Sequence, residues 1–127
     1  MIVLDSSGWL EFFGAGVHAN AFAQRLRQPA NVLTPTIALY EVYKWIKRER
    51  SEEDAIAAVA TMKKTQVVGL TEEIALTAAD LSLAHHLAMA DAVMLATARK
   101  YDAELMTTDS DFEGIASVTV LRANRDE

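Results

Sequence analysis

The stretch over residues 90–112 constrains the fold of this chain more than any other, because a helix, a strand and two acids follow one another there. Asp91 opens an apolar helix, a short strand is predicted at residues 104–107, and Asp109 follows that strand directly. A helix leading into a buried strand is half of the repeating unit of parallel α/β proteins. The stretch therefore predicts a sheet that receives one carboxylate from a helix N-terminus and another from a strand C-terminus.

Other short apolar runs predict strands at residues 2–4, 31–33, 66–68 and 117–121. The first run is apolar throughout, as expected of a strand that is covered on both faces of a parallel sheet. Helices are predicted at residues 9–13, 18–27, 34–50, 51–64 and from Thr71 to a connector at residues 85–90. This alternation predicts an α/β fold: one domain over residues 1–127, with a mostly parallel central sheet of four to five strands and helices on both faces.

Capping residues set several of the predicted helix boundaries. Thr34 and Pro35 are the expected N-cap and first helical residue of the helix that runs to about Arg50. Ser51 and Thr71 are each followed by acidic residues, which is typical of a helix N-terminus.

Asp5 is a third acid at the end of a predicted strand. In open α/β sheets the functional crevice lies at the carboxyl ends of the strands. If the first and fourth strands are neighbours, Asp5 and Asp109 face one crevice, and Asp91 needs a route to the same place.

Glu41 lies in an i, i+4 row with Ile37 and Trp45. We expect Ile37, Val42, Trp45 and Ile46 to face the core and Lys44 and Lys47 to face water, so Glu41 borders the apolar stripe. A carboxylate there costs free energy unless it is paired or binds a metal. A salt bridge to Lys44, or packing of Trp45 over the Glu41 stem, is the alternative.

Together, Asp5, Glu41, Asp91 and Asp109 supply the oxygen ligands that Mg²⁺ prefers. Such a cluster would hold one or two ions, activate a water and stabilise charge on a phosphate. Without a metal, the carboxylates would raise one another's pKa. Each Asp also has a simpler reading: Asp5 and Asp91 as helix caps, and Asp109 as a turn residue.

Composition limits the classes of function. The chain has no cysteine, which excludes disulfides, thiolate metal sites and a cysteine nucleophile. No run approaches the ~18–20 apolar residues of a membrane span and no signal peptide is predicted, so a cytoplasmic location is expected. The net charge of −6 argues against a general nucleic-acid-coating protein but not against a nuclease, because metal-binding carboxylates count toward that total.

The basic residues gather in one helix, at Lys44, Lys47, Arg48 and Arg50. Such a run is either a solvated helix face or, beside Glu41, a surface that holds backbone phosphates. The pair His85 and His86 precedes Asp91 and is interpreted as a loop feature.

Taken in order, these motifs resemble those of the PIN-domain ribonucleases. Ile2-Val3-Leu4-Asp5-Ser6-Ser7 resembles the opening of that family, and Glu41 falls where those proteins place a helical Glu. Asp91-Ala92-Val93-Met94-Leu95-Ala96-Thr97-Ala98 resembles their third acidic motif, and Leu105-Met106-Thr107-Thr108-Asp109-Ser110-Asp111-Phe112 resembles their fourth. The small size is similar to that of the VapC-type toxins of toxin–antitoxin pairs.

The resemblance implies a Mg²⁺- or Mn²⁺-dependent endoribonuclease, the toxin of a type II toxin–antitoxin system. It cleaves RNA phosphodiester bonds with a metal-activated water, forms a homodimer and is inhibited by a cognate antitoxin that wraps around it. By motif match, Asp5 and Asp91 are the main metal ligands, and Glu41 and Asp109 complete a catalytic set of four. Ser6 and Thr107 match polar positions of the pocket, and Asp111 is an auxiliary acid. The His85 and His86 pair departs from the family pattern.

Two other classes of protein share part of this pattern. A phosphotransfer receiver also places strand-end acids around Mg²⁺, but it carries paired acids after its first strand, where this chain has Asp5 alone. A non-catalytic PIN-like module that binds RNA or protein would be indicated by loss of one of the four acids, and all four are present.

Overall fold

The computed structural model, which describes residues 1–122, has a five-stranded sheet in the order β3-β2-β1-β4-β5. All four strand pairs are parallel. The strands are β1 (Ile2–Leu4), β2 (Val32–Pro35), β3 (Gln66–Val68), β4 (Glu104–Thr107) and β5 (Val118–Val120). Each of the five apolar runs forms a strand, so the predicted α/β class and parallel sheet are confirmed. The order differs from the 2-1-3-4-5 order of receivers, which removes that alternative.

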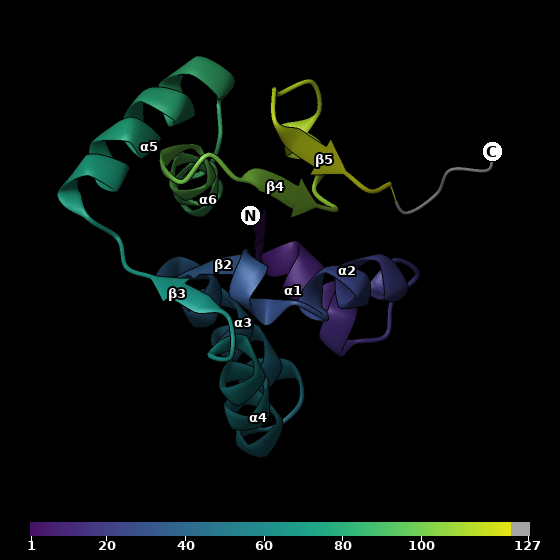
Figure 1. The fold of residues 1–127 in the computed structure, drawn as a ribbon. Helices are drawn as coiled ribbons and strands as arrows, with labels where there is room; N and C mark the ends of the chain where they lie inside the picture. The colour runs from purple at the N-terminus through teal and green to yellow at the C-terminus, as the bar shows by residue number, and fades with distance from the viewer. Residues whose placement is uncertain (123–127) are drawn as a thin grey trace.

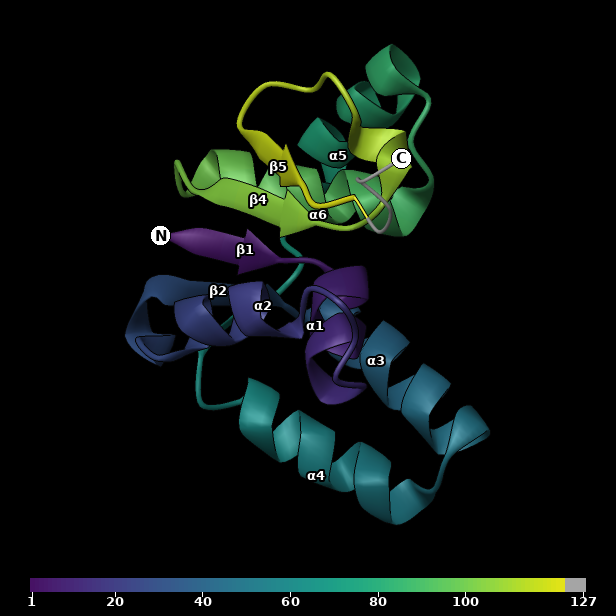
Figure 2. The ribbon, with the colours of Figure 1, turned by 90° about the vertical axis from the view of Figure 1, so that its right-hand side faces the viewer.

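Helices cover both faces of the sheet, as predicted. Figure 2 shows α2 in front of β2 and α6 behind β4. The helices α3 and α4 pack against each other and project away from the sheet (Figure 1). The helices are α1 (Ser6–Phe13), α2 (Ala19–Leu26), α3 (Thr36–Glu49), α4 (Glu52–Met62), α5 (Glu72–His85) and α6 (Met89–Lys100), with short 3-10 turns η1 (Pro29–Asn31) and η2 (Ser110–Phe112).

The core lies on both sides of β1, where Val3 and Leu4 are fully buried. On one side it is filled by α6, whose residues 92–98 are all buried. A helix that is buried all round needs no polar face, and this explains the unbroken small and apolar sequence after Asp91.

No single helix within residues 1–122 is long and apolar enough to cross a membrane. The pair α5 and α6 would pass that test together by length and composition, but it is bent by 116°.

The predicted start of α3 is wrong by one residue. Thr34 and Pro35 extend β2, opposite Val67 and Val68 of β3, and Pro35 is the N-cap of α3. The Thr65 hydroxyl donates its hydrogen to the Met62 carbonyl at 2.6 Å. In the 2.6 Å contact between the Thr34 and Thr65 hydroxyls, Thr34 is therefore the donor. The Thr34 hydroxyl therefore joins β2 to the turn before β3 and caps no helix. The N-caps Ser51 and Thr71 are confirmed.

Two further helix starts differ from the prediction. Helix α1 begins at Ser6, directly after β1, because the Asp5 side chain caps it by accepting from the Gly8 amide at 3.0 Å. Helix α6 begins at Met89, so Asp91 lies within its first turn. Trp45, expected in the core, is 39% exposed.

Candidate metal centre

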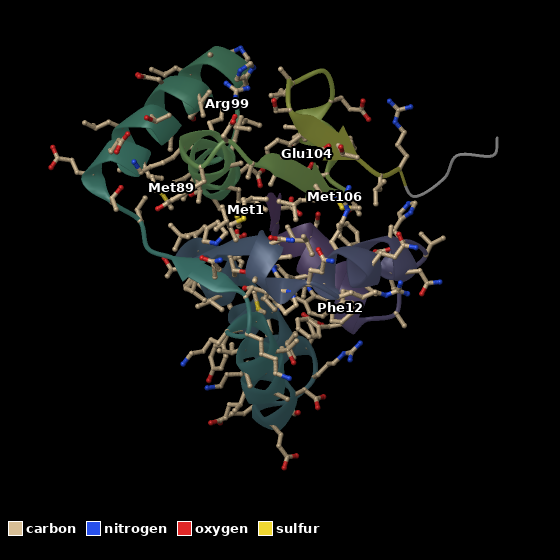
Figure 3. The ribbon with its side chains drawn as sticks, in the orientation of Figure 1. Met1, Phe12, Met89, Arg99, Glu104 and Met106 are labelled. Atoms are coloured by element: carbon tan, nitrogen blue, oxygen red, sulfur yellow. The ribbon has the colours of Figure 1, made fainter. Side chains whose placement is uncertain are left out.

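The carboxyl ends of β1 and β4 lie side by side, because these strands pair in parallel with Leu4 opposite Met106. In Figure 2 both arrowheads point toward the side on which α1 and α3 lie. Figure 3 labels Glu104 and Met106 on β4, and Met106 belongs to the end nearer α1. Asp5 directly follows β1, and Asp109 comes two residues after β4. The first and fourth strands are therefore neighbours, which was the condition for Asp5 and Asp109 to face one crevice.

Asp91 reaches this edge because α6 leads into β4. A helix that feeds a parallel strand runs in the opposite direction to that strand, so its N-terminus lies at the carboxyl edge of the sheet. The N-cap of α6 is Ala88, which has no capping side chain. The alternative reading of Asp91 as a helix cap is therefore wrong, and the carboxylate has no capping partner.

A cavity of about 380 Å³ opens at this edge. All four predicted acids line it, with Glu41 contributed by α3. The structure brings these acids together, and their metal-binding and catalytic roles stay predictions. The lining residues are Asp5, Ser6, Ser7, Leu10, Tyr40, Glu41, Lys44, Trp45, Arg48, Asp91 and Asp109.

The Asp5 carboxylate is 3% exposed and fixed by three donors. Its Oδ1 accepts from the Ser7 hydroxyl at 2.7 Å and from the Gly8 amide at 3.0 Å, and its Oδ2 accepts from the Thr107 hydroxyl at 2.6 Å. Burial raises the pKa of Asp5; the three hydrogen bonds oppose that rise, and the nearby Asp109 carboxylate adds to it. This carboxylate is held in one orientation at the floor of the pocket.

Two hydroxyls tie the loop after β4 to the loop after β1. The Asp109 amide donates to the Thr107 hydroxyl at 2.9 Å, and the Thr108 amide donates to the Ser7 hydroxyl at 3.0 Å. The loop that carries Asp109 therefore takes its position from the same groups that fix Asp5. The motif match indicated Thr107 as a pocket residue but did not indicate Ser7. The only sequence signal for Ser7 was that it is a small polar residue two positions after Asp5.

Glu41 is anchored from the neighbouring helix, because the Ser6 hydroxyl donates to its Oε1 at 2.5 Å. Lys44 forms no ion pair with Glu41; its ammonium lies 3.3 Å from the Tyr40 hydroxyl. The predicted alternative of a Glu41–Lys44 salt bridge is therefore wrong.

Asp91 carries the strongest electrostatic signal of the site. Its pKa is raised from 3.8 to about 7, first by burial and then by the charges of Asp109, Asp5, Glu41 and Asp111, in that order. Within residues 1–122, no lysine, arginine or histidine forms an ion pair with any of these five acids. No direct ion pair thus relieves their mutual repulsion, and a bound cation would relieve it.

The tightest group of acids is Asp91, Asp109 and Asp111, each of which offers one carboxylate oxygen within 4.8 Å of the other two. An all-oxygen set of this kind suits a hard divalent cation such as Mg²⁺ or Mn²⁺. Asp111, expected only as an auxiliary acid, belongs to this group. The expected turn role of Asp109 is also observed, since its Oδ1 accepts from the Asp111 amide at 2.9 Å.

His85 and His86 do not line the pocket. They end α5, where His86 is the C-cap with a left-handed backbone (φ 57°), and both are exposed. His85 is the last residue of α5, so only His86 lies in the predicted connector.

Known structures share this fold. A toxin–antitoxin complex from Klebsiella pneumoniae aligns with a TM-score of 0.81 at 22% identity, covering 94% of this chain and 97% of that one. The sarcin–ricin loop cleaving toxin VapC20 of Mycobacterium tuberculosis gives 0.74 at 24% identity, covering 91% and 95%. VapBC-1 of nontypeable Haemophilus influenzae gives 0.72 at 19% identity, covering 96% and 98%.

At such identities these likenesses establish the fold alone. A comparison with curated protein sequences found no match. The family model of the PIN domain, however, matches residues 2–118. This chain belongs to the PIN-domain family.

Proposed function

We propose that this protein is a Mg²⁺-dependent endoribonuclease and the toxin of a type II toxin–antitoxin pair. The observation that carries the proposal is the gathering of Asp5, Glu41, Asp91 and Asp109 in one pocket where, within residues 1–122, none of them forms an ion pair with a basic side chain. Clustered acids without direct basic partners suit a site that binds a metal cation.

In this proposal Asp5 and Asp91 are the main ligands, and Glu41 and Asp109 complete the set, with Asp111 beside them. Hydrogen bonds from Ser7, Gly8 and Thr107 hold the Asp5 oxygens. A bound Mg²⁺ or Mn²⁺ would supply a Lewis acid that activates water and neutralises charge on a phosphate.

Relatives support the choice of substrate and partner. One structural neighbour is described as cleaving the sarcin–ricin loop, which is RNA, and others are toxin–antitoxin complexes. We therefore infer an RNA substrate and an antitoxin partner. The homodimer and the cytoplasmic setting are proposed from the resemblance of the sequence motifs.

The test compares the wild type with Asp5→Asn and Asp91→Asn. We expect calorimetry to show Mg²⁺ or Mn²⁺ binding that both variants weaken by more than about 100-fold, since loss of a group that merely supports a metal ligand already costs 10–100-fold. Cleavage of total RNA should be EDTA-sensitive in the wild type and absent in the variants.

Asp80→Asn is the matched control, because Asp80 is exposed on α5 and does not line the pocket. Thermal melts establish that each variant is folded. Full cleavage by folded Asp91→Asn would exclude the proposed site. Failure of the wild type to bind metal would instead favour a non-catalytic PIN-like binding module.

A further inference from the structure

The pocket has a second wall that metal binding does not use. It is formed by Tyr40, Lys44, Trp45 and Arg48 of α3. Residues 40, 44 and 48 form one i, i+4 row, and residues 41 and 45 form the adjacent row, so Glu41 belongs to the same face. At 1.5 Å per residue this face is about 12 Å long. It begins at the acids and leads away from them.

The aromatic side chains of this face are exposed. Tyr40 is 58% exposed and Trp45 is 39% exposed, whereas Trp9, the other tryptophan, is fully buried. The two exposed rings offer aromatic surface to a ligand at the mouth of an acidic pocket.

The cations of this face are available to a ligand. The Lys44 ammonium lies 5.4 Å from the centroid of the Tyr40 ring and has no carboxylate partner within residues 1–122. Arg48 pairs only with its neighbour Glu49, at 2.8 Å, and both side chains are about half exposed. Such surface pairs are weak and exchange readily. Positive charge therefore alternates with aromatic surface along the face.

We propose that this face of α3 binds single-stranded RNA, with bases stacked on Tyr40 and Trp45 and phosphates held by Lys44 and Arg48. The inference rests on the proposed function and assigns four residues of this chain to the binding of its RNA substrate. Aromatic rings reach the faces of bases only where those bases are unpaired. Exposed aromatics interleaved with cations are the features that bind single strands without reading their sequence. A duplex hides the base faces and would gain only the phosphate contacts.

Binding is measured separately from cleavage, with an unpaired RNA octamer in EDTA, in the wild type and in Asp91→Asn. Because Trp9 is buried, quenching of tryptophan fluorescence reports on Trp45. We expect the octamer to quench Trp45 and the same sequence as a duplex to bind more weakly. The affinities of the variants are read from the fluorescence anisotropy of an end-labelled octamer, because the Trp45 variants lack the reporter ring. Tyr40→Ala and Trp45→Ala should each weaken octamer binding between about 5- and 150-fold, the range measured for a lost base stack. Trp45→Phe should retain most of the affinity.

Tyr101→Ala is the matched control. Tyr101 is 42% exposed and has Lys100 5.9 Å from its ring centroid, but it does not line the pocket. We expect this variant to bind the octamer like the wild type. In cleavage assays, the Tyr40 and Trp45 variants should raise KM and leave Mg²⁺ affinity unchanged.

The inference is overturned if the octamer fails to quench Trp45 in both backgrounds, or if the Tyr40 and Trp45 variants bind it within twofold of the wild type. It is also overturned if those variants keep RNA affinity but lose a co-expressed protein partner, since the face would then dock protein. Octamer binding by a protein that neither binds Mg²⁺ nor cleaves RNA would support this inference while contradicting the proposed function.

Discussion

The pKa of Asp91 is shifted by burial and by all the other acids of the site. Its pKa of about 7 exceeds the value of 3.8 for a free aspartate, because burial and four neighbouring acids oppose its ionisation. An acid whose pKa is higher in the folded state binds its proton more tightly there. Ionisation of Asp91 therefore opposes folding at pH values above about 7, and this opposition fades as the pH falls through 7 toward 3.8.

The metal-free protein should accordingly be more stable at pH 6 than at pH 8. We expect a higher Tm at pH 6 in EDTA, measured by calorimetry. Asp91→Asn, which cannot ionise, should raise the Tm at pH 8 and reduce the difference between the two pH values. Histidines titrate in the same window, so the comparison with the variant isolates Asp91. An unchanged difference in Asp91→Asn would show that Asp91 ionises without penalty.

The contact between α1 and α2 supports the site through Gly8. A Cβ at this position would lie 2.6 Å from Cε1 of Phe22, which is fully buried. The amide of Gly8 also donates to Asp5. The packing of the two helices and the position of the first predicted ligand are therefore linked.

Gly8→Ala should cost about 1–3 kcal/mol of unfolding free energy, as is typical of overpacking a core. It should also weaken Mg²⁺ binding by displacing the Asp5 cap. Denaturant titration and calorimetry measure the two effects. Gly69→Ala is the control, because a Cβ there meets nothing within 4 Å. A Gly8→Ala variant as stable as the wild type would mean that Phe22 can rearrange.

Periodicity and composition were sufficient to predict the elements themselves. All five strands lie at the predicted runs because each is a short apolar stretch between breakers. The start of α3 was missed because Thr34 and Pro35 satisfy a helix-cap pattern as well as they satisfy a strand end. Trp45 was misplaced because its spacing from Ile37 and Glu41 fits a buried row. How far along a helix the side chains are buried depends on which elements pack against that helix. The spacing of apolar residues within the helix does not show this.

The acids of the site could be predicted from the sequence, but the hydrogen bonds that hold them in place could not. Asp5, Glu41, Asp91 and Asp109 could be selected because each stands at an element end or beside an apolar row. The bond from Thr107 to Asp5 and the contact between the Ser7 and Thr107 hydroxyls depend on the register between β1 and β4, which places residues about a hundred positions apart in contact. Sequence spacing carries no information on that register.

The whole molecule has a net charge of −6, which opposes the approach of RNA, itself a polyanion. The inferred RNA surface on α3 must therefore act at short range. Lys44 and Arg48 line the pocket, whereas Lys47 of the same helix does not. Lys47 also holds its ammonium 5.4 Å from a ring centroid, that of Tyr43, and it lies 3.9 Å from the Glu52 carboxylate. The two lysines differ in position relative to the pocket.

This difference gives a prediction for the salt dependence of RNA binding. Two phosphate contacts to a single strand should give a slope of about −1.4 in log affinity against log salt. Lys44→Ala should reduce its magnitude by about 0.7, and Lys47→Ala should leave it unchanged. Fluorescence titrations in EDTA at several salt concentrations measure the slope. If net charge governed binding, screening would weaken the repulsion and affinity would rise with salt. A negative slope that changes in Lys44→Ala and not in Lys47→Ala would thus locate the RNA on this face of α3.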